Sequence, residues 1–513
     1  MSPAPSCIIA HDLGTTGNKA TLYDAEGRVL ARAYVGYETT YPQTGWAEQE
    51  ARQWWDAVRD CTHRLLRDGA VAPADVAVVA FSGMMQACLP VDERGQPLRP
   101  AMIWADQRAT AQAARLEERL GMATVHRITG HRITPTLSGA KIAWVREHEP
   151  EIYARAYKFL HVKDFIVQRL TERFVTDRSD ASGMNLYDLA QGTWSAPILD
   201  VLGIDVEKLP AIYDSTAIVG EVTRAAAAEV GLRPGTPVVI GAGDGVSATV
   251  GAGAVREGLA YNYVGSSSWI AFSSPRPLDD PGMKIFNYAH AVPGQFVPCG
   301  TMQAAGGSYQ WLRRQVCTSE AEGARQAGVD PYEVMNLAAE QSPPGANGLI
   351  FLPYLMGERT PYWNPRARGA FIGLTLRHTR ADLIRATLEG ITLNLRLILD
   401  TYREAGAAIH EMRAIGGGAK GRFWRQMMAD VYGLPVLCPR QLEEATALGA
   451  AIIGGVGVGL FPGFAVVDQF IEIVDRHLPD PQAHAVYQRL LPIFRDAYTA
   501  LRPIYEQLHA FAG

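Results

Sequence analysis

A strand, a glycine followed by hydroxyl residues, and a second strand occur twice in this chain. The first copy reads CIIAHDL, GTTGN and KATLYD over residues 7–24, and the second reads LAYNYV, GSSS and WIAF over residues 259–272. Their turn glycines, Gly14 and Gly265, lie about half of the 513-residue chain apart. Such a duplication predicts two domains built on one plan; the alternative is that the short pattern recurs by chance.

The length supports two or more domains, because 513 residues exceed what one hydrophobic core usually organises. We place the boundary in the loop-like segment GAGAVREG, which gives an N-terminal domain of residues 1–254 and a C-terminal domain of residues 255–513 that ends in a helical segment. In the second half, apolar strands alternate with helical runs at residues 382–402, 424–432 and 483–509. This alternation is typical of α/β domains with mixed sheets, and we expect the two domains to meet at a cleft.

Charge and cysteine usage exclude several functional classes. The 48 basic and 53 acidic residues give a net charge of −5, which argues against nucleic acid as the principal partner. The six cysteines are far apart and form no C-x-x-C pair, so we expect reduced thiols in a cytoplasmic protein and no zinc site. The uncharged stretch 445–467 is rich in glycine and contains Pro462. It predicts a buried helix followed by a loop and no membrane span.

Two aspartates follow apolar strands and precede glycine-rich turns. Asp12 lies in HDLGTTG, where backbone N–H groups and hydroxyls can bind phosphate oxygens with a metal ion between them. The alternative is that Asp12 only stabilises its own turn. Asp244 follows the strand TPVVIGAG and opens a small-residue helix, a position where catalytic carboxylates of α/β proteins often lie.

Other nucleotide-binding patterns fit less well. VVIGAG resembles the start of a dinucleotide-binding fingerprint, but the third glycine of that pattern is replaced by Val246. The chain contains no G-x-x-x-x-G-K-[ST] segment, so the sequence does not support a P-loop enzyme. A third glycine cluster at residues 416–418 would let a flat ring such as adenine lie close to the backbone; the alternative is an ordinary strand-to-helix turn.

Several segments together resemble the FGGY family of carbohydrate kinases. SGAKIAWV at residues 138–145 is similar to the first signature of the family, and GAFIGLTLRHTRADLIRATLE at residues 369–389 is similar to the second. HDLGTTG, LPYLMGERTPYWNP around Glu358, and IGGGA follow the family's order, so the resemblance covers nearly the whole chain. Among family members the chain is most similar to xylulokinases. The resemblance implies an actin-like ATPase fold, in which two RNase H-like domains flank a central cleft.

The resemblance also implies that the chain transfers the γ-phosphoryl group of ATP to a sugar hydroxyl. Asp244 corresponds to the family's catalytic base, and Asp12, together with Asp244, to the carboxylates near Mg²⁺. The positions that correspond to the nucleotide site are Gly14, Thr15, Thr16, Gly265, Ser266, Gly306, Gln310, Gly417, Gly418 and Ala419. A more distant alternative is an actin-like ATPase without a sugar substrate, because that fold serves both functions.

The sugar-binding positions of the family match only in part. Trp104 and Asp106 match its W-x-D segment, with an indole face for C–H groups and a carboxylate for hydroxyls, although Trp104 could also be a core residue. The sugar site would further contain Met85, Gln86, Asp244 and Gly245.

Gln86 and Gly245 stand where xylulokinases usually have His and Asn. The expected acceptor is D-xylulose, giving D-xylulose 5-phosphate; gluconate, another ketose or a polyol is the alternative. Gluconate would require a cation, for which Arg108 and Lys141 are the nearest candidates. Members of the family often form dimers, so a homodimer is a further expectation.

Overall fold

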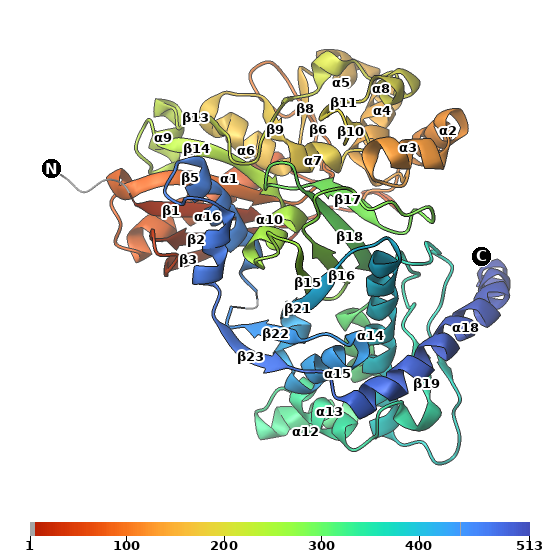
Figure 1. Ribbon diagram of the computed structural model, residues 1–513. Helices are drawn as coiled ribbons and strands as arrows, with labels where there is room; N and C mark the ends of the chain where they lie inside the picture. Colours follow the sequence, from red (N-terminus) through yellow and green to blue (C-terminus); the bar gives the residue numbers. More distant parts are fainter. Residues whose placement is uncertain (1–5, 442, 513) are drawn as a thin grey trace.

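Two mixed β-sheets, one from each half of the chain, form the framework of the computed structural model, which describes residues 6–441 and 443–512 (Figure 1). The first sheet has six strands in the order β13-β14-β5-β1-β2-β3. Their bounds are β1 Cys7–Leu13, β2 Gly17–Tyr23, β3 Val29–Gly36, β5 Val76–Gly83, β13 Ile218–Glu221 and β14 Pro237–Gly243. The first sheet therefore begins with the strand–turn–strand unit expected from the sequence.

The second sheet repeats this plan with one strand more, in the order β17-β18-β16-β15-β21-β22-β23. Its strands are β15 Gly258–Val264, β16 Ser268–Phe272, β17 Phe286–Ala289, β18 Phe296–Met302, β21 Ile409–Ile415, β22 Val436–Pro439 and β23 Ile473–His477. In each sheet an antiparallel hairpin leads into three parallel strands: β1, β5 and β14 in the first, and β15, β21 and β22 in the second. The duplication inferred from the two glycine turns is thus a duplication of topology.

Alternating side chains bury both faces of the first sheet. Along β1, Ile9 and Leu13 belong to the core under α1 (Ala51–Asp68), whereas Ile8 and Ala10 face the core between the two halves. The helix α1 forms because its apolar residues recur every three to four positions, among them the buried Trp54.

Two helices cross where the halves meet. α10 (Asp244–Gly251) follows the third parallel strand of the first sheet, and α16 (Ala445–Gly457) follows the third parallel strand of the second. They are in contact along their lengths, and α16 also packs on β1, β5 and β14 of the first sheet (Figure 1). A Cβ atom on Gly251 would lie 1.7 Å from the carbonyl oxygen of Ala445, so only glycine permits this approach.

The remaining elements cover the sheets and extend the first half. Around the first sheet lie α2 Thr110–Leu120, α3 Met122–Thr129, α4 Ser138–His148, α5 Pro150–Arg155, α6 Val162–Thr171, α7 Arg178–Ser182, α8 Ala196–Leu202 and α9 Arg224–Val230. Short strands among them are β4 Glu48–Gln49, β6 Leu89–Val91, β7 Ala101–Met102, β8 Lys158–Leu160, β9 Val175–Asp177, β10 Tyr187–Asp188, β11 Thr193–Trp194 and β12 Ala211–Tyr213.

The second half contains one long central helix, α14 (Arg380–Glu404), on its sheet and a long terminal helix, α18 (Pro481–Ala512) (Figure 1). With them lie α11 Gly306–Gln315, α12 Thr318–Ala327, α13 Pro331–Glu340, α15 Arg422–Tyr432, α17 Val467–Phe470, β19 Ile350–Leu352 and β20 Ala370–Ile372. Of the helices in the described part of the chain, none combines the length and the apolar character needed to cross a bilayer. The predicted boundary between residues 254 and 255 falls between α10 and β15, and it stays a prediction.

Candidate active site

Asp12 lies near the end of β1, in register with Ser82 on the parallel strand β5. The Ser82 hydroxyl donates a hydrogen bond of 3.2 Å to Oδ1 of Asp12. Burial raises the pKa of Asp12 to about 6, although the nearby Lys19 ammonium opposes this shift. The carboxyl group is therefore held in place by the strand pairing, in surroundings that disfavour its charged form.

Asp244 is the first residue of α10, directly after the parallel strand β14. Its Oδ1 accepts a hydrogen bond of 2.7 Å from the backbone N–H of Gly245. Burial raises the pKa of Asp244 to about 7, and the charge of Asp12 adds to this shift. The ends of β1 and β14 thus bring the two carboxyl groups close enough for the charge of Asp12 to disfavour the ionisation of Asp244.

Both aspartates line a cavity of about 240 Å³, which we call the carboxylate cavity. It is lined by Asp12, Gly14, Lys19, Asp244, Ala248, Tyr263, Trp269, Ile415, Gly416, Gly417, Glu443, Ala445 and Thr446. The lining comes from both halves of the chain. Two carboxylates that repel each other in one cavity form an oxygen-rich donor set, which suits a hard divalent cation such as Mg²⁺.

A second cavity, of about 380 Å³, lies in the second half and is called here the aromatic cavity. It is lined by Val264, Gly265, Ser266, Gly306, Tyr309, Gln310, Asp330, Tyr332, Glu333, Asn336, Gly417, Gly418, Lys420, Gly421 and Trp424. Gly417 lines both cavities, so they adjoin at this residue. Aromatic walls with a few convergent polar groups are typical of sites for flat, partly polar ligands.

Backbone contacts explain why this second site needs glycine. The N–H of Gly306, at the start of α11, donates a hydrogen bond of 2.9 Å to the carbonyl of Gly265. A Cβ atom on Gly306 would lie 2.4 Å from that oxygen. Gly416 has φ +88° and lies against Val264, the residue before the Gly265 turn. Three glycine segments that are far apart in the sequence therefore meet at one place.

The predicted nucleotide residues divide into three groups. Those that line the aromatic cavity are Gly265, Ser266, Gly306, Gln310, Gly417 and Gly418. Gly14 lines the carboxylate cavity, and Thr15 and Thr16 follow it in the same turn. Ala419 is fully buried and lies outside the lining of both cavities, because the short helix that contains it turns its side chain into the core.

The predicted sugar residues Met85, Gln86 and Trp104 are placed by contacts with β14, β17 and the first glycine turn. Met85 packs against Gly243, whose Cβ would lie 2.6 Å from Cγ of Met85. Gln86 has φ +67°, and its side chain lies near the Tyr288 hydroxyl on β17, where it opposes the rise in the pKa of Tyr288 that burial causes. Trp104 is 39% exposed and donates a hydrogen bond of 2.9 Å to the Thr15 hydroxyl, which joins the W-x-D segment to the first glycine turn.

The surroundings of Asp106 disfavour a direct sugar contact. Its side chain is fully buried, and its oxygens accept hydrogen bonds of 2.6–3.1 Å from the backbone and guanidinium of Arg108 and from the N–H of Ala47. The Arg108 guanidinium is therefore already paired with Asp106. Lys141 is also fully buried, and its ammonium donates to the carbonyls of Gln86 and Ile103. The sequence did not reveal that Asp106 and Arg108 pair with each other and that Lys141 binds backbone carbonyls inside the fold.

Two further residues were not singled out as site residues by the sequence, although both lie in the quoted segment LPYLMGERTP. Burial raises the pKa of Glu358 to about 8, and its carboxyl group accepts the N–H groups of Gln303 and Arg359. Burial lowers the pKa of Arg359, which lies near Tyr288 and Cys299. Within the described part of the chain, no group accepts a hydrogen bond from the Arg359 guanidinium.

Comparisons with known proteins support this picture. The family model for the N-terminal domain of FGGY carbohydrate kinases matches residues 7–251, and the model for the C-terminal domain matches residues 260–458. A gluconokinase from Bacillus licheniformis is 34% identical over 504 residues, which is 98% of each chain. A xylulose kinase from Bacillus subtilis is 31% identical over 506 residues, covering 98% of this chain and 99% of the relative.

Solved structures agree with the sequence comparison. A ligand-bound xylulose kinase and a gluconate kinase, both from Lactobacillus acidophilus, each superpose with a TM-score of 0.91 at 28% identity, over 98% of this chain and 99% of theirs. Plasmodium falciparum glycerol kinase, at 20% identity and a TM-score of 0.84, shares the fold. The structure and these comparisons show an actin-like arrangement of two similar domains. The chain belongs to the FGGY family of carbohydrate kinases.

Proposed function

We propose that this protein transfers the γ-phosphoryl group of ATP to a terminal hydroxyl of an open-chain sugar, with Asp244 as the general base. The observation that carries the proposal is the arrangement of the two cavities. The carboxylate cavity holds Asp12 and Asp244, and it adjoins the aromatic cavity at Gly417. A nucleotide bound with its base among Tyr309, Trp424 and their neighbours would direct its phosphates toward the two carboxylates.

In this mechanism Asp244 accepts the proton of the attacking sugar hydroxyl. Without a bound cation, burial raises its pKa to about 7, and a positioned base contributes about 10²–10⁴-fold to the rate. Asp12 and Asp244 would hold Mg²⁺, which supplies charge neutralisation to the phosphates. The Gly14 and Gly265 turns offer backbone N–H groups from opposite halves, and movement of the halves toward each other would exclude water.

D-Xylulose, giving D-xylulose 5-phosphate, is the first candidate acceptor. Its support is the partly exposed indole of Trp104, which the hydrogen bond to Thr15 holds beside the first glycine turn. An indole face suits the C–H groups of a short sugar. The similarity to xylulose kinases over nearly the whole chain is further support.

Gluconate is the second candidate, and specific observations favour it. Among the described residues, no heavy atom lies within 4 Å of the Cβ position of Gly245, so this position leaves room for a longer substrate. The gluconokinases among the relatives reach 34% identity. Arg108 and Lys141 are engaged in the core, whereas Arg359, near Tyr288 and Cys299, is a cation that could pair with a sugar carboxylate.

A panel of acceptors tests the proposal. D-Xylulose, D-ribulose, L-xylulose, D-gluconate, glycerol and erythritol would each be supplied with ATP and Mg²⁺, and ADP release and the phosphorylated product would be measured. We expect one acceptor to dominate and ADP release to depend on it. An ATPase rate that no acceptor changes would refute the kinase proposal and favour an actin-like ATPase.

The variant Asp244→Asn completes this test. It keeps the size of the side chain but removes the proton acceptor, so we expect native circular dichroism and a loss of turnover of about 10²–10⁴-fold. A variant that retains most of its turnover would show that Asp244 is not the base. The homodimer and the cytoplasmic location expected from the sequence stay predictions.

A further inference from the structure

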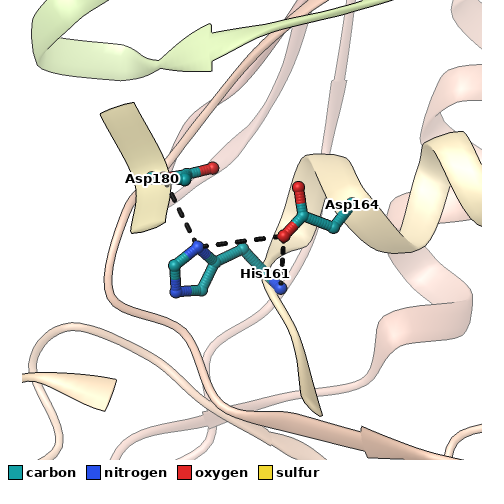
Figure 2. A group of neighbouring side chains, drawn as sticks. All are labelled: His161, Asp164 and Asp180. Atoms are coloured by element: carbon teal, nitrogen blue, oxygen red, sulfur yellow. Dashed lines mark hydrogen bonds and ion pairs between the residues drawn. The ribbon is translucent and has the colours of Figure 1, made fainter. Parts of the chain in front are cut away.

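Five ionisable side chains lie together in the core of the first half, beneath the strand that carries Asp244. This buried charge cluster consists of His161, Lys163, Asp164, Asp177 and Asp180, none of which is more than 1% exposed. Its members come from the start of α6, the end of β9 and the short helix α7. Figure 2 shows His161, with Nδ1 directed toward the carboxyl groups of Asp164 and Asp180.

His161, Asp164 and Asp180 resemble a set of metal ligands, but a cation is already present among them. The ammonium of Lys163 lies 2.8 Å from Oδ1 of Asp164, 2.8 Å from Oδ1 of Asp177 and 3.0 Å from Oδ2 of Asp180. One ammonium therefore contacts all three buried carboxyl groups. Removing one partner from such a group leaves an uncompensated buried charge, so each member depends on the others.

The strand above this cluster is irregular just before Asp244. β14 pairs with β5 through Val239 and Ala80 and then through Ala242 and Ser82, so β14 carries one residue more than its partner at this point. Gly241 has φ +75°, and its N–H bonds to the carbonyl of Ser215. Such a bulge redirects the residues that follow it and takes backbone groups out of the ladder.

One of these backbone groups is bound by the charge cluster through a serine. The N–H of Gly243, the residue before Asp244, donates a hydrogen bond of 2.9 Å to the hydroxyl of Ser179. That hydroxyl donates in turn a bond of 2.6 Å to Oδ2 of Asp177, whose other oxygen faces Lys163. An unbroken chain of contacts therefore joins the buried lysine to the backbone at the N-terminus of α10.

We propose that Ser179 is a positioning residue for Asp244, and that Asp177 and Lys163 act through it. The hydroxyl fixes the Gly243 amide and with it the first turn of α10, so the carboxyl group of Asp244 is aimed at the carboxylate cavity. This proposal rests on the proposed role of Asp244 as the base. A displacement of about 1 Å at a reacting group can reduce a rate about 10²-fold.

The variant Ser179→Ala tests this role. It leaves the Gly243 N–H without its partner while it changes little volume. We expect kcat to fall about 10- to 100-fold, because only the alignment of the base is lost. KM for ATP and for the acceptor should stay within about twofold, because the residues that line the two cavities are unchanged.

The matched control is Ser182→Ala on the same helix. Ser182 is equally buried, donates to the carbonyl of Ser179 and accepts the N–H of Ala289, but it does not contact Gly243. We expect this variant to keep kcat within about threefold of the parent, since the amide before the base stays bound. Equal losses in the two variants would show that general packing of α7 is responsible, and would overturn the proposal.

A second variant tests the proposal in case Ser179→Ala does not fold. Ser179→Cys keeps the shape of the side chain with a somewhat larger atom and makes weaker hydrogen bonds, so its kcat should lie between those of the parent and Ser179→Ala. If Ser179→Ala fails to fold, a Ser179→Cys variant with the parent kcat overturns the proposal. The proposed function fails separately, when the parent phosphorylates no acceptor or Asp244→Asn stays active.

Discussion

The reactivity of single residues in this protein follows from how their charges are paired. Asp12 and Asp244 are buried beside each other, which raises their pKa values to about 6 and about 7. Asp106, in contrast, is satisfied by Arg108 and is withdrawn from any ligand. Two buried carboxyl groups that line one cavity, with Lys19 beside Asp12, form a site that suits a metal ion and a proton acceptor.

Arg359 gives a residue-scale test of the acceptor. If gluconate is the substrate, Arg359→Gln should lower kcat/KM for gluconate about 10- to 100-fold, since a hydrogen bond to a charged group contributes about 1.5–3 kcal/mol. Turnover of D-xylulose should change little, because it has no carboxylate. Steady-state kinetics with both acceptors measures the difference. Arg359→Lys, which keeps the charge, is the control; equal loss for both acceptors would exclude selective anion recognition.

Among the elements, the crossing of α10 and α16 depends on glycine. A Cβ atom on Gly449 would lie 1.9 Å from the carbonyl oxygen of Ser247. We therefore expect Gly449→Ala to push the helices apart and to destabilise the fold by about 1–3 kcal/mol, seen as a lower thermal midpoint.

Gly323 in α12 provides the matched control for this prediction. Among the described residues, no heavy atom lies within 4 Å of its Cβ position. Gly323→Ala should raise the midpoint slightly, because alanine restricts the unfolded chain and fits a helix, a gain of about 0.4–1 kcal/mol. A midpoint for Gly449→Ala that is equal to or higher than that of Gly323→Ala would contradict a tight crossing.

The start of α14 gives an element-scale prediction about pH. The carboxyl group of Asp382 accepts hydrogen bonds from the N–H of Thr379, from Ser342 and from Asn347. Burial alone would raise the pKa of Asp382, but these bonds outweigh it and lower the value to about 2. The stabilisation is therefore complete above the unfolded pKa of about 4, and it is lost as the pH falls toward 2.

Asp382→Ala should consequently lower the free energy of unfolding by about 1–2 kcal/mol at pH 7, which is the usual effect of removing a helix cap. The difference in free energy of unfolding between parent and variant should become smaller when the pH falls from 7 to 3. Urea unfolding at the two pH values measures this difference. A difference that is the same at both values would mean that ionisation of Asp382 contributes nothing to stability.

At the scale of the whole molecule, the two halves contribute different parts of one site. The first half supplies Asp12 and Asp244, and the second supplies the aromatic cavity. Because α16 of the second half packs on the sheet of the first, the halves are coupled through a contact that does not involve the ligand. Ligands that bridge the cavities should therefore stabilise the whole molecule.

A thermal-shift experiment checks this coupling. ATP with Mg²⁺ should raise the unfolding midpoint more than ATP with EDTA, because a ligand that binds more tightly stabilises the folded state more. At 100 times its Kd, a ligand adds about 2.7 kcal/mol to the free energy of unfolding. EDTA should also abolish turnover until Mg²⁺ is restored. Asp12→Asn is the control, since it should lose most of the Mg²⁺-dependent increment. A midpoint that does not respond to Mg²⁺ would contradict a metal role for the two aspartates.

Much of the fold could be predicted from local patterns. The repeated glycine turns indicated two similar sheets, and the helical runs expected at residues 382–402, 424–432 and 483–509 match α14, α15 and α18 within a few residues. The glycine segments that line the aromatic cavity were also visible, because close backbone contact requires glycine wherever it occurs. The burial of Ala419 and the pairing of Asp106 were not visible, since they depend on how segments face each other after folding.

The sequence by itself determined the repeated plan, the turns that can bind phosphate, and the two aspartates at strand ends. Each of these features depends on a few consecutive residues, because the spacing of apolar residues and the freedom of glycine act on the local backbone. Only the tertiary structure decided which charged side chains are paired with other residues. It paired Arg108 with Asp106, left Arg359 without a partner among the described residues, and placed Ser179 beneath Gly243. The physical reason is that pairing and burial arise from contacts between residues far apart in the chain, and these contacts set the electrostatics of the site.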